Sequence, residues 1–237
     1  MKRLLPVLLL AVFLLALFAG YRIAPGLFDS NPTQDAAPVS GPQQASAVSL
    51  RQENVLLVQV DSLQNPQPAL LATWLGFLSF GEDAQLLFLP LFPSGNASRD
   101  QELARRFALG SDGMPGTGFV QYLRSTFHVS WSPLLLVDSQ GLATIHSTLL
   151  GTDPGTAYQV APQEASSTER LSPTYHLIQV ACDQFIQDPA TTAGQIPWLS
   201  LEPDHLRTSL ELDELINTAR TLKTSQTASC KPIVGDQ

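Results

Sequence analysis

Basic residues are scarce in this chain. Its 237 residues include 13 lysines and arginines against 21 aspartates and glutamates, which gives a formal net charge of −8 at pH 7. Beyond the first apolar stretch, the only adjacent basic pair is Arg105–Arg106. Nucleic acid binding depends on clustered basic side chains that release counterions from phosphates. The scarcity of such clusters therefore excludes a nucleic-acid-binding domain.

Motifs of several common enzyme classes are also missing. The chain has no G-x-S-x-G elbow, no G-x-x-x-x-G-K-[ST] loop, no H-E-x-x-H motif and no C-x-x-C pair. The glycine-dense stretch 110–118 has no lysine to meet a phosphate, so it predicts a flexible loop. The four histidines, His128, His146, His176 and His205, stand singly without other ligands at the spacing of a zinc site. We expect them to be surface or packing residues.

Only two cysteines are present, Cys182 and Cys230. Outside the cytoplasm a disulfide between them would persist. Cys182 also lies on the apolar face of an expected helix, where a free thiol packs as a small hydrophobic side chain. The sequence leaves both states open.

One long uncharged run stands at the start of the chain. Residues 4–21 carry no charge and approach the length that crosses a bilayer. Basic residues precede the run and only Arg22 follows closely, which favours a cytoplasmic N-terminus. We predict a single-pass transmembrane anchor over 1–23, with the rest of the chain outside the cytoplasm at the cell membrane. A cleaved signal peptide is the alternative, although Leu17-Phe18-Ala19 is a poor cleavage site.

The remainder divides by composition. Residues 24–50 are rich in proline, glutamine, serine and alanine and contain hardly any aromatic side chain, so they predict a flexible linker. Residues 51–223 have enough apolar content for one packed domain. The Thr-Ser-Gln stretch and Pro232 predict a loose tail over 224–237.

Apolar runs and helical periodicity alternate along residues 51–223. The apolar run at 70–80 would also fit a buried helix, but its pairing with the run at 85–89 indicates a hairpin. The expected strands are 54–60, 70–80, 85–89 and 133–137, and the expected helices are 99–109, 118–127, 177–186 and 212–222. A turn is expected at 138–141 and an irregular stretch at 151–170. The pattern predicts an α/β fold, a central mixed β-sheet with helices on both faces, preceded by one transmembrane helix.

Taken in order, these features resemble the LytR-CpsA-Psr (LCP) family. Its members are bacterial membrane-anchored enzymes that transfer glycopolymers from polyprenyl-pyrophosphate carriers to the cell wall. The strand that ends in Asp61-Ser62, the helix and glycine loop at 103–110, the helix, strand and turn within 122–151, and the closing pattern at 208–215 are similar to the family's segments. The resemblance spans residues 51–222 and implies the family's α-β-α fold at the outer face of a membrane.

The departures fall on positions that hold the family's chemistry. Its Arg-x-Asp-Thr, Pro-Arg-Asp and Arg-Gln-Gln motifs correspond here to Leu-Leu-Ala-Thr at 70–73, Pro-Leu-Phe at 90–92 and Pro-Thr-Tyr at 173–175. A pyrophosphate and its Mg²⁺ need several guanidinium groups and at least two carboxylates. The apolar replacements supply neither.

Two residues still match functional positions of the family. Asp61 matches a metal ligand, and the alternative is a carboxylate that caps a strand-end turn. Arg170 matches an arginine before the long helix and is the candidate catalytic residue, with a solvated loop residue as the alternative. The family's apolar pocket for the polyprenyl tail does not depend on Asp61 or Arg170. Its candidate lining is Trp74, Phe77, Phe88, Phe92 and Trp198, with ordinary core packing as the alternative.

The resemblance and its departures together predict a function. We expect a membrane-anchored, extracytoplasmic LCP-like protein of the cell envelope that has lost transferase activity. It would bind a polyprenyl-linked lipid, a glycopolymer or another apolar ligand, or scaffold envelope assembly. One alternative is an active LCP phosphotransferase that uses Mg²⁺, Asp61 and Arg170. The other is a tethered protein-interaction domain without a lipid pocket.

Overall fold

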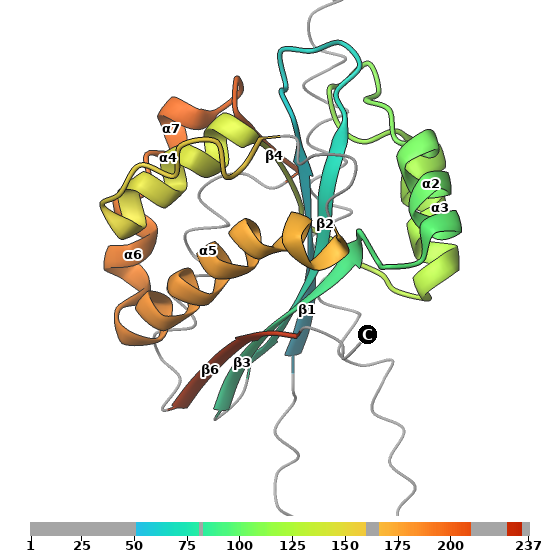
Figure 1. Cartoon of the computed structure of the whole chain (residues 1–237). Helices are drawn as coiled ribbons and strands as arrows, with labels where there is room; N and C mark the ends of the chain where they lie inside the picture. The colour runs from blue at the N-terminus through green and yellow to red at the C-terminus, as the bar shows by residue number, and fades with distance from the viewer. Residues whose placement is uncertain (1–50, 81–82, 160–165, 210–226, 234–237) are drawn as a thin grey trace, which may run out of the picture. The chain divides into compact units, whose positions relative to one another are not determined.

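The computed structural model describes residues 51–80, 83–159, 166–209 and 227–233 (Figure 1). All of them belong to one unit, Val48–Gln237. The predicted anchor and linker, 1–23 and 24–50, and the predicted helix 212–222 lie outside the described residues. Within the described ranges, no helix is both long enough and apolar enough to cross a bilayer.

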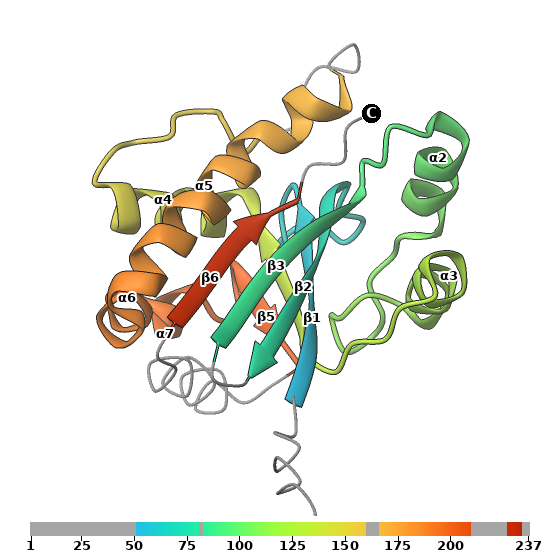
Figure 2. The same cartoon turned by 90° about the horizontal axis from the view of Figure 1, so that it is seen from below.

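Six strands form one mixed sheet in the order β5-β4-β1-β2-β3-β6. The strands are β1 (Arg51–Val60), β2 (Leu70–Phe80), β3 (Asp83–Phe92), β4 (Leu134–Asp138), β5 (Leu206–Thr208) and β6 (Thr227–Pro232). β1, β2 and β3 form an antiparallel meander, whereas β4 runs parallel to β1 and β6 runs parallel to β3. Figure 2 shows β6 beside β3, at the edge of the sheet that lies farthest from β5.

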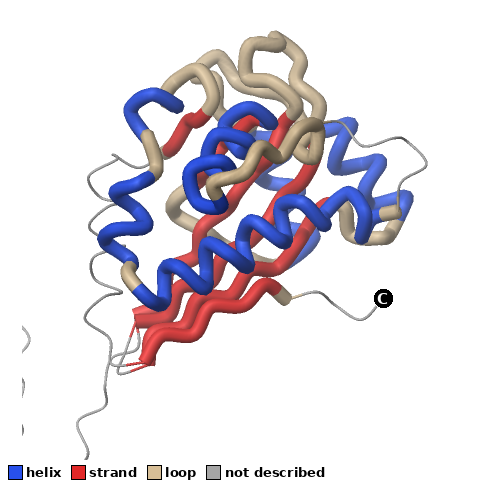
Figure 3. The backbone as a smooth tube through the Cα atoms, turned by 60° about the vertical axis from the view of Figure 1, so that its left-hand side comes forward, coloured by secondary structure: helices blue, strands red, loops and turns tan. Residues whose placement is uncertain are grey.

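Helices cover both faces of this sheet. They are α2 (Ala97–Arg106), α3 (Thr117–Phe127), α4 (Ser139–Leu150), α5 (Ser167–Gln187), α6 (Pro189–Gln195) and α7 (Trp198–Leu201). α2 and α3 lie on one face, and α4 to α7 lie on the other (Figure 1). Figure 3 shows α5 running along the sheet in front of the strands. The predicted α/β fold with helices on both faces is confirmed.

Side-chain alternation along the strands explains the layers. Leu56 and Val58 of β1 belong to the apolar cluster under α2 and α3, while Leu57 between them packs on the opposite face. In β4, Leu136 faces α2 and α3, and Val137 faces the cluster under α4, α6 and α7. A strand covered on both faces has a continuous apolar run, which is the pattern that predicted β1 and β4.

Two predicted loop regions are helical instead. The expected turn at 138–141 is the start of α4, because the Asp138 carboxylate accepts a hydrogen bond from the Gly141 N–H at 2.8 Å and so caps the helix. The expected irregular stretch 151–170 is interrupted at Ser167, where α5 begins. Ser166 and Glu169 form a capping box there, with each side chain bonded to the other residue's backbone N–H. These predictions missed the helix-capping signals.

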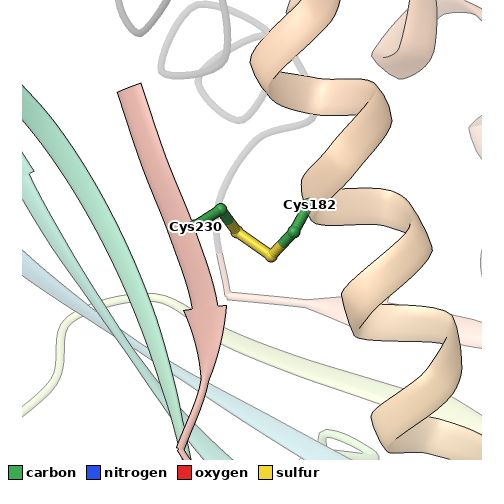
Figure 4. Close-up of a disulfide and its surroundings, with 2 residues drawn as sticks. All are labelled: Cys182 and Cys230. Atoms are coloured by element: carbon green, nitrogen blue, oxygen red, sulfur yellow. A yellow bond between two sulfur atoms is a disulfide. The ribbon is translucent and has the colours of Figure 1, made fainter. Parts of the chain in front are cut away.

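The prediction of a loose tail over 224–237 is wrong for β6. Its six residues pair with Asp83–Phe88 of β3, and Cys230 forms a disulfide with Cys182 on α5 (Figure 4). The two Cα atoms are 5.2 Å apart. The sequence had allowed either a disulfide or two free thiols. It fastens the last described strand to a helix 48 positions earlier in the chain.

Candidate functional site

The candidate site lies at the carboxyl ends of the neighbouring inner strands β1 and β4. These two strands are parallel neighbours, and Val60 of β1 stands opposite Asp138 of β4. Ligands of α/β proteins bind outside the carboxyl ends of parallel strands. Asp61 follows β1 directly, so Asp61 and Asp138 bring two carboxyl groups to the same edge.

The Asp61 carboxylate organises the loop between β1 and β2. Its Oδ1 accepts hydrogen bonds from the backbone N–H groups of Ser62 at 2.8 Å and Ala69 at 2.7 Å. The Asp61 N–H in turn donates to the Ala69 carbonyl oxygen at 3.1 Å. These bonds are those of a carboxylate that caps a strand-end turn. A metal-binding role for Asp61 stays a prediction.

The surroundings of Asp61 do not fit Mg²⁺ with a pyrophosphate. Ala72 occupies the position that corresponds to the family's second aspartate, and its side chain is 1% exposed in the apolar cluster of Trp74, Leu171, Ile178 and Cys182. Leu70, at the corresponding arginine position, is buried in the cluster under α2 and α3. Within the described parts of the chain, no group of three or more His, Cys, Asp or Glu residues could hold a metal ion.

Arg170 lies on α5 and not in a loop. Its guanidinium group stacks over the ring of Phe92, with 5.4 Å between Cζ and the ring centroid. Phe92 is buried at the end of β3, so the structure brings this pair of predicted site residues together. A cation–π contact of a partly buried arginine stabilises the docking of α5 on the sheet. The catalytic role of Arg170 stays a prediction.

A buried polar bond joins α5 to the centre of the sheet. The Thr174 hydroxyl donates to Oε1 of Gln59 at 2.8 Å, and both side chains are buried. Thr174 lies in the segment that corresponds to the family's Arg-Gln-Gln motif. In this chain the segment is part of α5, with Pro173 inside the helix. The side chain of Thr174 therefore holds the helix to β1.

Asp138 and His205 form a pair that the sequence did not predict. Asp138 is 1% exposed, and its Oδ2 accepts hydrogen bonds from the Leu63 N–H at 3.2 Å and from Nδ1 of His205 at 3.0 Å. With the Gly141 N–H at its other oxygen, this buried carboxylate has three donors. Because a carboxylate only accepts, Nδ1 of His205 carries the hydrogen. An aspartate directly before an apolar helical repeat was the signal for the cap, but nothing in the sequence indicated His205.

A second polar group lies between α4 and α5. Tyr158 is buried, and its hydroxyl is 2.9 Å from Nδ1 of His146. Burial raises the pKa of Tyr158 to about 12, and burial together with the charge of His176 lowers the pKa of His146. The contact between these two side chains joins α4 to the loop that follows it.

The five predicted pocket residues do not share one cluster. Trp74 and Phe88 pack under α5, Phe77 and Phe92 pack in the cluster under α2 and α3, and Trp198 packs in the third cluster. The Nε1 atom of Trp74 is buried without a hydrogen-bond partner in the described structure. Trp74 is fully buried, so this donor does not open onto a ligand site.

Comparisons with known proteins give similar structures without similar sequences. The sequence matches no protein-family model and no curated protein. TagT bound to LIIa-WTA is 12% identical, with 78% of this chain and 79% of that chain covered and a TM-score of 0.46. Protein gbs0355 from Streptococcus agalactiae is also 12% identical, with 78% of each chain covered and a TM-score of 0.49. B. subtilis TagV is 9% identical, with 78% and 85% covered and a TM-score of 0.46.

TagT and TagV belong to the family that the sequence resembles. At these identities, and with TM-scores below 0.5, the similarity assigns neither a fold nor a function to this chain. The roles of individual residues in this chain therefore rest on its own contacts.

Proposed function

We propose that this chain is an LCP-like protein of the bacterial cell envelope that binds a polyprenyl-linked ligand without transferring it. Residues 4–21 would anchor it in the cell membrane with the domain outside the cytoplasm. The buried position of Ala72 carries the proposal. Phosphoryl transfer from a pyrophosphate depends on cations that neutralise the developing charge. Leu171 and Trp74 belong to the cluster that surrounds the place where a second metal-binding carboxylate would stand.

The remaining polar groups support the same conclusion. The Oδ1 atom of Asp61 holds two backbone N–H groups, and the guanidinium group of Arg170 lies over Phe92. An active LCP phosphotransferase would need both side chains at the substrate. Each of them has a structural partner here.

Catalysis is tested with the full-length chain, Mg²⁺ and a polyprenyl-pyrophosphate-linked disaccharide, by measuring the release of polyprenyl phosphate. We expect no release above the protein-free control, and no difference between the wild type and Asp61→Ala. Release by the wild type that Asp61→Ala abolishes would establish the active transferase instead.

A tethered protein-interaction domain without a lipid pocket is the second candidate. The complete burial of Trp74 and the separation of the aromatic residues over three clusters favour it. Native mass spectrometry of the full-length chain with polyprenyl phosphate separates the two. Retained polyprenyl phosphate supports the first candidate, and a bare chain supports the second.

A further inference from the structure

Positive charge in the described domain is concentrated on α2 and α3. These helices hold four arginines and two acidic residues, whereas the rest of the described chain holds four basic and eleven acidic residues. The net charge therefore changes sign between this helix pair and the remainder of the domain. Such segregation creates a local potential that attracts anions although the whole protein is acidic.

The arginines of α2 reach across to aromatic rings of α3. The Cζ atom of Arg106 lies 4.9 Å from the ring centroid of Tyr122, and that of Arg99 lies 5.4 Å from the ring centroid of Phe127. Arg105 projects outward with 67% of its side chain exposed. These five residues are called the arginine–aromatic surface below.

Glu102 fixes the two neighbouring arginines of this surface. Its carboxylate accepts hydrogen bonds from Arg105 at 2.8 and 2.9 Å and from Arg106 at 2.5 Å. These bonds hold the pKa of Glu102 at about 2, so the carboxylate stays ionised at neutral pH. One carboxylate balances one of the two guanidinium charges. A net positive charge remains beside exposed donors that suit a phosphate group.

We propose that the arginine–aromatic surface docks on the anionic phospholipid headgroups of the bilayer that holds the anchor. This inference rests on the proposed function, which places the domain on a membrane tether. Arginine binds phosphate oxygens with paired donors. Tyr122 and Phe127 are half-buried against the core, so the guanidinium groups over their rings make the contact. The tether favours the membrane over a soluble polyanion, because it keeps the headgroups near this surface.

The tether makes weak docking sufficient. If residues 24–50 are the flexible linker that the sequence predicts, their root-mean-square span is about 30 Å, which keeps the surface within reach of the headgroups. Each arginine near an anionic surface raises the ratio of docked to free domain about fivefold. The three arginines thus favour the docked domain without a deep binding site.

Hydrogen–deuterium exchange of the full-length chain in lipid nanodiscs tests this surface. Nanodiscs of phosphatidylcholine alone are compared with nanodiscs in which part of the lipid is phosphatidylglycerol. We expect slower exchange over residues 97–127 with phosphatidylglycerol, and a return to the phosphatidylcholine rate at high salt. The variant Arg105→Gln with Arg106→Gln is expected to lower the ratio of docked to free domain about 25-fold.

The matched control removes the same charge from β1 and β6, through Arg51→Gln with Lys231→Gln, and is expected to keep the protection. Equal exchange in both kinds of nanodisc, or equal loss in both double variants, overturns the proposal. Protection by long-chain polyphosphate but not by phosphatidylglycerol would also overturn it, in favour of a soluble polymer. Failure of the tether is seen separately, because the chain then does not co-purify with nanodiscs of phosphatidylcholine alone.

Discussion

Ala72 lies on the face of β2 that α5 covers. Its methyl group belongs to a cluster with Trp74 and Leu171, and almost none of its surface is exposed. At this position a carboxylate would be desolvated among apolar side chains, without a cation to pair with it. The surroundings have therefore changed together with the residue, and a single substitution does not rebuild a metal site.

The substitution Ala72→Asp tests this packing. We expect it to lower the free energy of unfolding by about 3–5 kcal/mol, because it leaves a buried charge unpaired. The same change at the exposed Ala108 is expected to alter it by less than about 0.5 kcal/mol. Urea denaturation of both variants measures the difference. An Ala72→Asp variant as stable as the wild type would show that this position can accept a carboxylate.

Asp138 has a structural role at the end of β4, which neighbours β1 in the sheet. Replacement by asparagine keeps one acceptor oxygen but places an amide N–H₂ group against N–H donors of Gly141 or of Leu63 and His205. We expect Asp138→Asn to lower the free energy of unfolding by about 1–3 kcal/mol. Asp153→Asn is the control, because Asp153 accepts one bond in an exposed turn. Similar losses in both variants would contradict a special role for Asp138.

At the level of elements, apolar patterning predicted β1 to β4, α2 and α3 because each has a strong local signal. α4 was missed because Asp138-Ser139-Gln140-Gly141 also has the composition of a turn. β6 was missed because its residues are mostly polar and its partner β3 is distant in the sequence. For Asp61, the sequence predicted either a metal ligand or a carboxylate that caps a strand-end turn. The pair of Asp138 and His205, 67 positions apart, depends on the tertiary fold.

The disulfide is expected to contribute much of the stability of β6. Closing a loop of 48 positions stabilises the folded state by about 4 kcal/mol, mainly by restricting the unfolded chain. The variant Cys182→Ala with Cys230→Ala should lose about that much in urea denaturation, and the amides of β6 should exchange faster. The wild type treated with dithiothreitol serves as the comparison. Unchanged exchange in β6 would show that strand pairing alone holds it.

For the whole molecule, the predicted anchor decides where the domain acts. If residues 1–23 remain attached, the full-length chain stays in the membrane fraction after alkaline washing, and intact mass spectrometry shows the complete N-terminus. A chain that begins at Val48 should be released by the same wash. A mature chain without its first apolar segment would instead identify a cleaved signal peptide.

The proposed function has two parts: the domain binds a polyprenyl-linked ligand, and it does not turn that ligand over. A time course of native mass spectrometry with the full-length chain, Mg²⁺ and polyprenyl-pyrophosphate-linked disaccharide tests both parts in one measurement. We expect a complex whose bound mass remains that of the intact pyrophosphate ligand. Conversion of the bound mass to polyprenyl phosphate would contradict it, and so would a chain that retains no ligand.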